Sequence, residues 1–153
     1  MQRFYKLKNV LLFYIEKLGG VFVTKMNKLL FYTDFLSYRE YGQAITGLSF
    51  RAIQYGPVPN NWDRVYSLID DISQNEVDFK SGAFGTKLVS EISCDISSFT
   101  PDQLSIIERV YETFKEDSST SLSEKSHKES AWIENQETHS VIDFKYAFSL
   151  KAI

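Results

Sequence analysis

The strongest hydrophobic pattern in the chain lies between residues 24 and 41. Five positions recur at the spacing of one helical face: Met26, Leu29, Leu30, Thr33 and Leu36. Aromatic residues mark a second face, so the helix is apolar nearly all round, as helices buried among other elements are. We predict a central helix over 24–41, with Thr24 as its N-cap and Gly42 as its C-terminal stop.

Two more segments carry clear helix signals. Residues 3–18 place apolar side chains at helical spacing, and Gly19-Gly20 ends that pattern. The run Thr100-Pro101-Asp102-Gln103 combines an N-cap, a proline at the first helical position, an early acid and Gln at N3. We therefore predict helices over 3–18 and from 101 to about 115, and a shorter polar helix over about 120–130.

After Gly42 the pattern loses its helical period. Alternation of apolar and polar residues predicts a strand over 48–54. Two prolines make Gly56-Pro57-Val58-Pro59 a stiff bend that is expected to break regular pairing, because each pushes the preceding residue to an extended conformation. Asn60 or Asn61 would then cap a helix whose inward face carries Trp62, Val65, Tyr66, Ile69 and Ile72.

Residues 76–92 form a second region with strand patterns. Residues 77–79 and 87–92 alternate, with a glycine-containing loop between them. Together with the strand near residue 50 they are expected to form one small antiparallel sheet of about three strands. The tail over 141–150 alternates as a strand does, but it is short enough to be a helical turn instead.

The predicted fold class is α+β, mostly α: a helical bundle around the 24–41 helix with the small sheet beside it. A length of 153 residues suits a single domain over 1–153, and 43% hydrophobic residues can build a self-supporting core. No apolar run approaches the ~20 residues of a membrane span, and the N-terminus lacks the pattern of a secretion signal. Cys94 is the only cysteine, which excludes an internal disulfide. We therefore expect a cytoplasmic protein without a membrane partner.

The net charge of −3 is spread unevenly along the chain. Residues 1–56 hold eight Lys and Arg against three Asp and Glu, a surplus of +5 that leaves −8 for the remainder. Such asymmetry can mark a surface for an acidic partner or nucleic acid. A solvated helix face explains the same charges, and no arginine-rich run or aromatic-interleaved basic motif accompanies them. Nucleic-acid binding by this domain alone is therefore not expected.

Asp34 is an unusual candidate, because it lies inside the apolar central helix. A buried acid needs an arginine or backbone donors as partners, and Arg51 and Arg64 are the arginines to consider first. Two interpretations stay open: an internal hydrogen-bonded strut, or a carboxylate at a pocket or partner site.

Ser123 and His127 stand four residues apart, which places them on one helix face. A nucleophile and its base could have this spacing, but no third orienting group or oxyanion site accompanies them. His127 is better explained as a hydrogen-bonding anchor between its helix and the core. Cys94, His127 and His139 lack the close pair spacing of metal ligands, and no glycine-rich phosphate loop is present. We predict a non-enzymatic protein with no catalytic, cofactor or metal site.

Several short motifs occur in an order that resembles a known family. They are Lys28–Asp34 (KLLFYTD), Gly42, Ile45-Thr46-Gly47, Tyr55–Pro59 (YGPVP), Leu122-Ser123, Ser126-His127 and Ala131-Trp132. This ordered set resembles the SocA-like, or Panacea, domain, whose members are bacterial and phage antitoxins of toxin–antitoxin pairs. Many members carry an extra DNA-binding region before this domain, which is not recognised here. The alternative function, a DNA-associated regulator of its own operon, therefore rests on the basic first third of the chain.

The resemblance implies a helical bundle with a small antiparallel sheet, and an antitoxin that neutralises a cognate protein toxin by direct contact. Some members are linked to delivery of the toxin to a protease, so a protease is a further implied partner. The bend from Gly56 to Trp62 either sets only the angle between a strand and a helix or forms part of a rigid recognition surface. The candidate partner-binding residues are Asp34, Tyr55, Gly56, Pro57, Val58, Trp62, His127 and Trp132.

Overall fold

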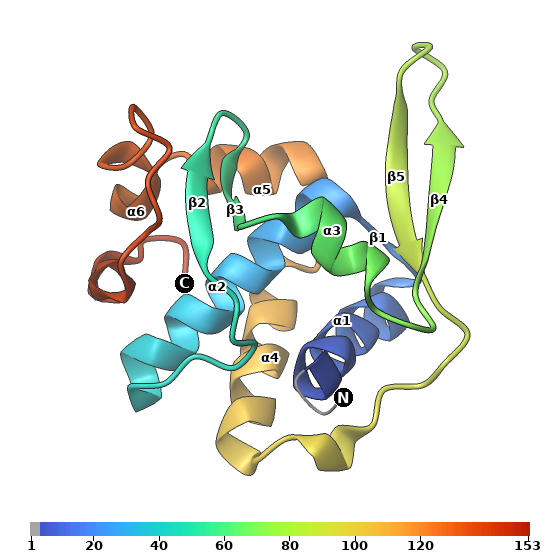
Figure 1. Cartoon of the computed structure of the whole chain (residues 1–153), viewed down its shortest axis with the longest axis horizontal. Helices are drawn as coiled ribbons and strands as arrows, with labels where there is room; N and C mark the ends of the chain where they lie inside the picture. Colours follow the sequence, from blue (N-terminus) through green and yellow to red (C-terminus); the bar gives the residue numbers. More distant parts are fainter. Residues whose placement is uncertain (1–3) are drawn as a thin grey trace.

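Helix α2 (Val23–Tyr41) crosses the middle of the computed structural model, which describes residues 4–153 except for the side chain of Phe84 (Figure 1). Every residue from 26 to 37 is buried, which confirms the predicted central helix. The elements packed against it include α4 (Pro101–Phe114), α5 (Ser119–Ser126), the strand β3 (Gly56–Pro59) and the 3₁₀ helix η3 (Phe144–Ser149).

The two ends of α2 are set in different ways. Its N-cap is Phe22, which is extended and makes no capping hydrogen bond, so the prediction of Thr24 as N-cap is wrong. The reason is that Val21–Phe22 form a short strand, β1, and the chain passes from strand to helix without a loop. At the other end, Gly42 adopts a left-handed φ of 75°, which confirms the predicted stop.

The other two long helices also follow their local signals. Helix α1 (Tyr5–Leu18) ends before Gly19 as predicted, while the predicted start at residue 3 lies outside the described residues. Helix α4 has the predicted capping box: the Thr100 hydroxyl accepts from the Gln103 N–H at 3.2 Å, and the Gln103 side chain accepts from the Thr100 N–H at 3.0 Å. Its start is therefore fixed by four consecutive residues.

A three-stranded antiparallel sheet has the order β1–β5–β4, where β4 is Ser73–Asp78 and β5 is Phe84–Val89. These strands confirm the two predicted between residues 76 and 92, although both begin earlier. The prediction that the strand near residue 50 joins them is wrong, since that strand, β2 (Phe50–Ile53), pairs with β3 instead. The α+β class, mostly α, is nevertheless confirmed.

Both edges of β2 are occupied, which explains its separation from the other sheet. On one side, all four residues of β2 pair with residues of β3. On the other side, the Ala52 N–H donates to the Ser140 carbonyl at 3.2 Å, and the Ile142 N–H donates to the Phe50 carbonyl at 2.8 Å. No edge of β2 remains for β4 or β5.

The Gly56–Pro59 segment pairs as a regular strand, so the expectation that its prolines break pairing is wrong. In the antiparallel register, Gly56 and Val58 stand opposite Ile53 and Arg51, whose N–H and C=O groups point toward β3. Pro57 and Pro59 therefore place their missing N–H groups on the outer edge, where a strand tolerates proline. The following helix, α3 (Trp62–Ser67), carries Trp62, Val65 and Tyr66 as predicted but ends before Ile69 and Ile72. The Asn61 side chain makes no capping hydrogen bond.

The C-terminal third contains two short helices in place of the single helix predicted over 120–130. Helix α5 ends at Ser126 and α6 (Ser130–Ile133) follows after a turn, where Glu129 is buried. The Glu129 carboxylate accepts from the Tyr32 hydroxyl and from the N–H groups of Lys151 and Ala152, which ties the end of the chain to the core. The tail combines both alternatives left open: Val141 forms a bridge to Arg51, and η3 then follows.

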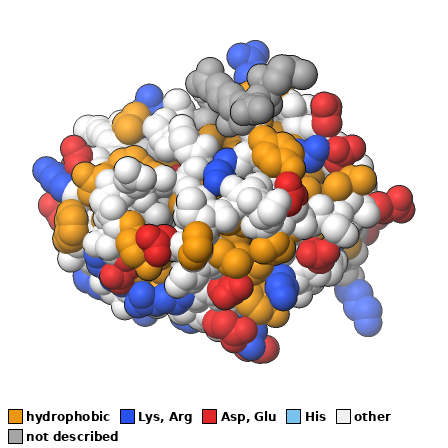
Figure 2. Space-filling view, turned by 90° about the horizontal axis from the view of Figure 1, so that it is seen from below, with side chains coloured by type: hydrophobic (Ala, Val, Ile, Leu, Met, Phe, Trp, Pro, Cys, Tyr) orange, Lys and Arg blue, Asp and Glu red, His pale blue; other side chains and the backbone are white. Residues whose placement is uncertain are grey.

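The surface shows no segregation of charge on the face seen from below. Acidic and basic side chains alternate there with small groups of hydrophobic side chains (Figure 2). None of the described helices is long and apolar enough to cross a membrane.

Asp34 is an internal strut that holds the loop after α2. Its side chain is fully buried; Oδ1 accepts from the N–H groups of Ile45 and Thr46 at 2.9 and 3.0 Å, and Oδ2 accepts from the Thr46 hydroxyl. Backbone donors thus replace the arginine partners considered from the sequence, since Arg51 bonds to Asn60 and the His139 carbonyl instead. Burial raises the pKa of the Asp34 carboxyl to about 6, against the opposing effect of these hydrogen bonds.

Replacing Asp34 by Ala should lower the free energy of unfolding by about 3–5 kcal/mol, because two buried N–H groups lose their acceptor. Asp34→Asn is the matched control, since its amide oxygen can still accept from both. The folded state of the wild type holds the Asp34 proton up to about pH 6, whereas the unfolded chain releases it near 3.8. As the pH rises from 4 to 6, the stability of the wild type should therefore fall relative to that of the Asn variant. Urea unfolding at several pH values checks this, and equal pH profiles would contradict it.

Candidate functional site

Three side chains, from α5, its C-cap residue and α6, hold the turn between β2 and β3 by its backbone. Trp132 Nε1, His127 Nε2 and Ser123 Oγ bond to the carbonyl oxygens of residues 53, 54 and 55, at 2.6, 3.0 and 3.1 Å respectively. The His127 and Trp132 rings also meet edge to face, with centroids 4.3 Å apart. We call these three donors the carbonyl clasp. The clasp fixes three successive peptide units, so the turn cannot move independently of the two helices.

The clasp determines how Ser123 and His127 are used. A carbonyl oxygen can only accept, so His127 Nε2 carries a hydrogen and donates it to the Gln54 carbonyl. His127 is thus a hydrogen-bonding anchor as expected, but it holds the exposed β2–β3 turn rather than the core. Ser123 directs its hydroxyl to the Tyr55 carbonyl, and no hydrogen bond joins the two side chains in the described part of the chain. A nucleophile activated by a base requires that bond.

Gly56 lies directly on α2 and α5. Its φ is +114°, which favours glycine, and a Cβ at this position would lie 2.7 Å from Lys28 Cε and 2.8 Å from Ser126 Oγ. A side chain at residue 56 would therefore require the Lys28 and Ser126 side chains, or β3 itself, to shift. The glycine is required both by the backbone conformation and by the close approach.

Lys28, beneath Gly56, is a buried cation without a counter-charge. The residue is 1% exposed, and its ammonium group takes part in none of the hydrogen bonds or ion pairs found among residues 4–153. Burial lowers its pKa to about 8. At neutral pH the group is therefore mostly charged, and its desolvation opposes folding.

Beside the clasp the surface is hollowed into a groove with two ends. The turn end, about 460 Å³, is lined by Tyr55, Ser123, Glu124 and His127. The hairpin end, about 770 Å³, lies against β1 and the β4–β5 hairpin, and Phe22, Trp62 and Phe79 are its aromatic residues. Thr24, Ser119 and Thr120 line both ends, so the two hollows are adjacent at the first turns of α2 and α5, and we call them together the groove.

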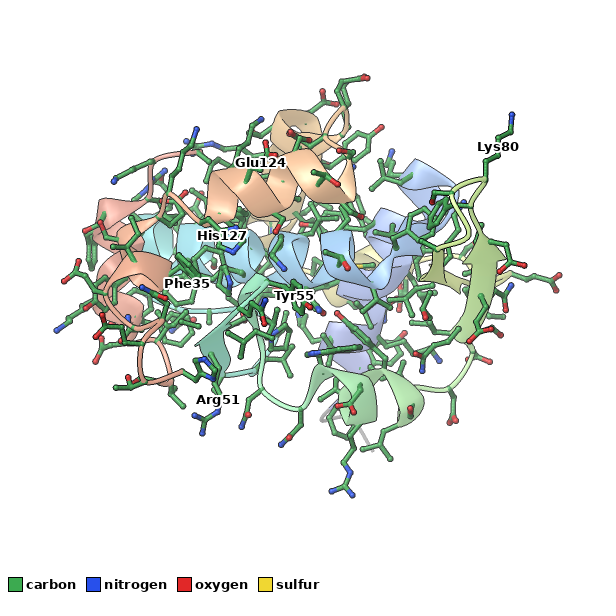
Figure 3. The ribbon with its side chains drawn as sticks, turned by 90° about the horizontal axis from the view of Figure 1, so that it is seen from above. Phe35, Arg51, Tyr55, Lys80, Glu124 and His127 are labelled. Atoms are coloured by element: carbon green, nitrogen blue, oxygen red, sulfur yellow. The ribbon has the colours of Figure 1, made fainter. Side chains whose placement is uncertain are left out.

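The candidate residues fall into three places. Tyr55, Gly56, Pro57, Val58, His127 and Trp132 come together at the clasped turn. Within this set, Tyr55 is 64% exposed whereas Gly56, Pro57 and Val58 are buried, so the latter three can serve a partner only by supporting the turn. Figure 3 shows Tyr55 and His127 next to one another beside α5, with Lys80 far away at the hairpin tip. Trp62 lies at the hairpin end of the groove, and Asp34 lies apart from it in the core.

Sequence reasoning missed two kinds of residue at this site. Lys28 had a visible signal, because it stands in the same apolar helix pattern that made Asp34 conspicuous. Phe22 and Phe79 had none, since they meet only through the pairing of β1 and the hairpin, with ring centroids 5.6 Å apart.

The groove carries hydroxyl groups, aromatic rings and lysines, which suit non-covalent binding. Among the residues that the structure describes, no group of three His, Cys, Asp or Glu side chains is placed to hold a metal ion. The arrangement therefore offers a shaped surface, with its side chains mounted on a fixed backbone.

Comparison with protein families gives one match. The model of the family described as "Antitoxin SocA-like, Panacea domain" matches residues 26–133. The match runs from α2 to the end of α6 and includes the clasp and most of the groove. Neither the curated proteins nor the solved structures contain a match.

Replacing Gly56 by Ala should lower the free energy of unfolding by about 2–4 kcal/mol, because the new Cβ meets Lys28 and Ser126 in a strained backbone conformation. Gly82→Ala is the matched control: its φ is +87°, but nothing lies within 4 Å of its Cβ position. That variant should lose about 1 kcal/mol. Urea unfolding measures both, and equal losses would show that the approach of β3 to α2 is not restrictive.

Replacing Lys28 by Met should raise the free energy of unfolding at pH 7 by about 2–3 kcal/mol, because an unpaired buried charge is removed at similar volume. The folded state gives up the Lys28 proton near pH 8, whereas the unfolded chain keeps it to about 10.5. Wild-type stability should therefore rise between pH 8 and 10, and the advantage of the Met variant should shrink. Urea unfolding at pH 7 and 9.5 tests this. A Met variant less stable than the wild type at pH 7 would reveal a stabilising partner for the ammonium.

Proposed function

Because the chain belongs to the SocA-like antitoxin family with the Panacea domain, we propose that it neutralises a cognate protein toxin by binding it directly, with the groove as the docking face. The observation that carries this proposal is the family match over the residues that build the clasp and most of the groove.

The rigidity of the turn supports a docking role for the turn end. Tyr55 presents an exposed ring while its own carbonyl is held by Ser123. A tyrosine on a fixed backbone loses little conformational entropy when a partner covers it, and tyrosine is enriched at binding hot spots. A stable complex buries about 800 Å² on each partner, so the toxin would cover both ends of the groove and the surface around them.

Delivery of the bound toxin to a protease is a second part of the proposal, motivated by the same family membership. Simple occlusion would leave the amount of toxin in the cell unchanged, whereas delivery would lower it. The abundance of toxin in cells that express both proteins therefore separates the two modes.

DNA binding is not proposed, because most of the basic residues behind that alternative have partners within the protein. Five of them are engaged with other side chains or backbone carbonyls: Lys6, Lys8, Lys25, Arg39 and Arg51. Lys28 is buried. Binding to DNA relies on several free cations placed along the phosphates.

The proposal predicts that this protein restores growth when co-expressed with the product of a neighbouring gene that arrests growth alone. Tyr55→Arg should abolish the rescue and weaken binding about thirtyfold, the equivalent of a 2 kcal/mol hot spot. Tyr41→Arg is the matched control, since Tyr41 is 48% exposed and lies outside the groove.

Colony counts and calorimetry on the purified pair measure these effects. If the wild type rescues no toxic neighbour, the antitoxin proposal is wrong for this chain. If Tyr55→Arg rescues as well as Tyr41→Arg, the turn end of the groove does not contact the toxin.

A further inference from the structure

The hairpin end of the groove is positively charged in a protein whose net charge is −3. Three lysines line it, Lys25, Lys87 and Lys115, and Asp117 is the one acidic residue among its lining residues. The first turns of α2 and α5 also open here, and helix N-termini add positive potential. The charge of the lining is therefore opposite in sign to that of the whole chain.

The one acid forms an ion pair with none of these three lysines, because its carboxylate is already engaged. Asp117 Oδ2 pairs with Lys125 at 2.9 Å, and Oδ1 accepts from Ser121 at 2.8 Å. Its side chain is 10% exposed in that pair. Asp117 meets Lys25 through its backbone carbonyl instead, at 2.5 Å.

Lys87 is the lysine best placed to meet a ligand. Its ammonium lies 5.6 Å from the centre of the Phe22 ring, and no carboxylate in the described part of the chain pairs with it. Lys115 pairs with Glu112 at 2.8 Å on the exposed side of α4, an arrangement worth little in water. Among the described residues, neither Lys87 nor Lys25 forms an ion pair, and Lys25 bonds to the backbone carbonyls of residues 115 and 117.

Aromatic side chains give the same end an apolar wall. Phe79 is 45% exposed, its ring lies 5.6 Å from that of Phe22, and Trp62 lines the hollow with them. Gly85 lets both phenylalanines approach β5, since a Cβ there would come within 3.2 Å of each ring. A volume of about 770 Å³ is in the range of sites that enclose a large side chain with its neighbours.

We propose that this hairpin end receives an acidic segment of the bound toxin, with carboxylates facing Lys87 and Lys25 and an apolar side chain against Phe22, Phe79 and Trp62. This inference rests on the proposed function, and it names the chemistry of the partner. A small inorganic anion would leave the aromatic wall uncovered. A nucleic acid would meet too few free cations for the several phosphate contacts that such binding needs.

The test compares charge reversals inside and outside the groove in a calorimetric titration with the purified toxin that the wild type neutralises. Lys87→Glu should weaken binding about tenfold or more at 50 mM salt, and by a smaller factor at 300 mM, because salt screens the repulsion. Lys87→Met, which keeps the apolar stem, should weaken binding by a smaller factor at low salt. Lys80→Glu is the matched control at the hairpin tip, outside the groove, and should change binding less than about twofold (Figure 3).

Each outcome decides between the two proposals. Suppose that the wild type binds and neutralises the toxin, and that Lys87→Glu is folded by circular dichroism and binds the toxin equally well. The inference of an acidic toxin segment at the hairpin end is then wrong, and the antitoxin function stands. If the wild type does not bind the toxin, both fail. If the loss appears with a DNA duplex rather than with the toxin, this end is a nucleic-acid site and the inference is overturned. A loss equal to that of Lys80→Glu would show a general charge effect and overturn it too.

Discussion

Complete burial of the middle of α2 makes each polar group on that helix dependent on a partner from another element. Asn27 accepts from Tyr66 of α3 at 2.7 Å, Thr33 shares a hydrogen bond with Tyr14 of α1 at 2.6 Å, and Asp34 holds the loop at residues 45 and 46. No fully buried side-chain nitrogen or oxygen in the described residues lacks a partner. Apolar packing is not directional, whereas these hydrogen bonds are. They therefore fix the positions of the neighbouring elements around α2.

Lys28 is the exception on this helix: its ammonium forms no hydrogen bond or ion pair with the described residues, and it is therefore not one of the fully buried atoms. It is the one residue of the buried 26–37 stretch whose charge has no partner among the described residues, and it lies beneath the turn that the clasp holds. The turn is close to α2 because residue 56 is glycine, and it stays there because three donors on α5 and α6 grip its carbonyls. The contact between β3 and the helices thus has two consequences: Lys28 is buried beneath the turn, and the exposed Tyr55 is held on a fixed backbone.

The chain belongs to an antitoxin family, and the motifs that it shares with that family mainly serve to hold the structure together. The YGPVP run places one exposed ring on a turn, while Ser123, His127 and Trp132 are occupied with holding that turn in place. Tyr55 belongs to these motifs, whereas the residues proposed to meet the toxin at the hairpin end, such as Phe79 and Lys87, lie outside them.

The sequence by itself determined the elements whose signals are local. The apolar pattern of 24–41, the glycine stop at Gly42 and the capping box at Thr100 each act within a few residues, so they were read correctly without a structure. The tertiary structure alone decided the strand partners and the clasp. Both depend on backbone groups that no sequence pattern marks, because every residue carries a C=O and every residue except proline an N–H. For the same reason, the partner of Asp34 was a pair of backbone amides rather than an arginine, and the groove arose where β1, the hairpin and α5 happen to meet.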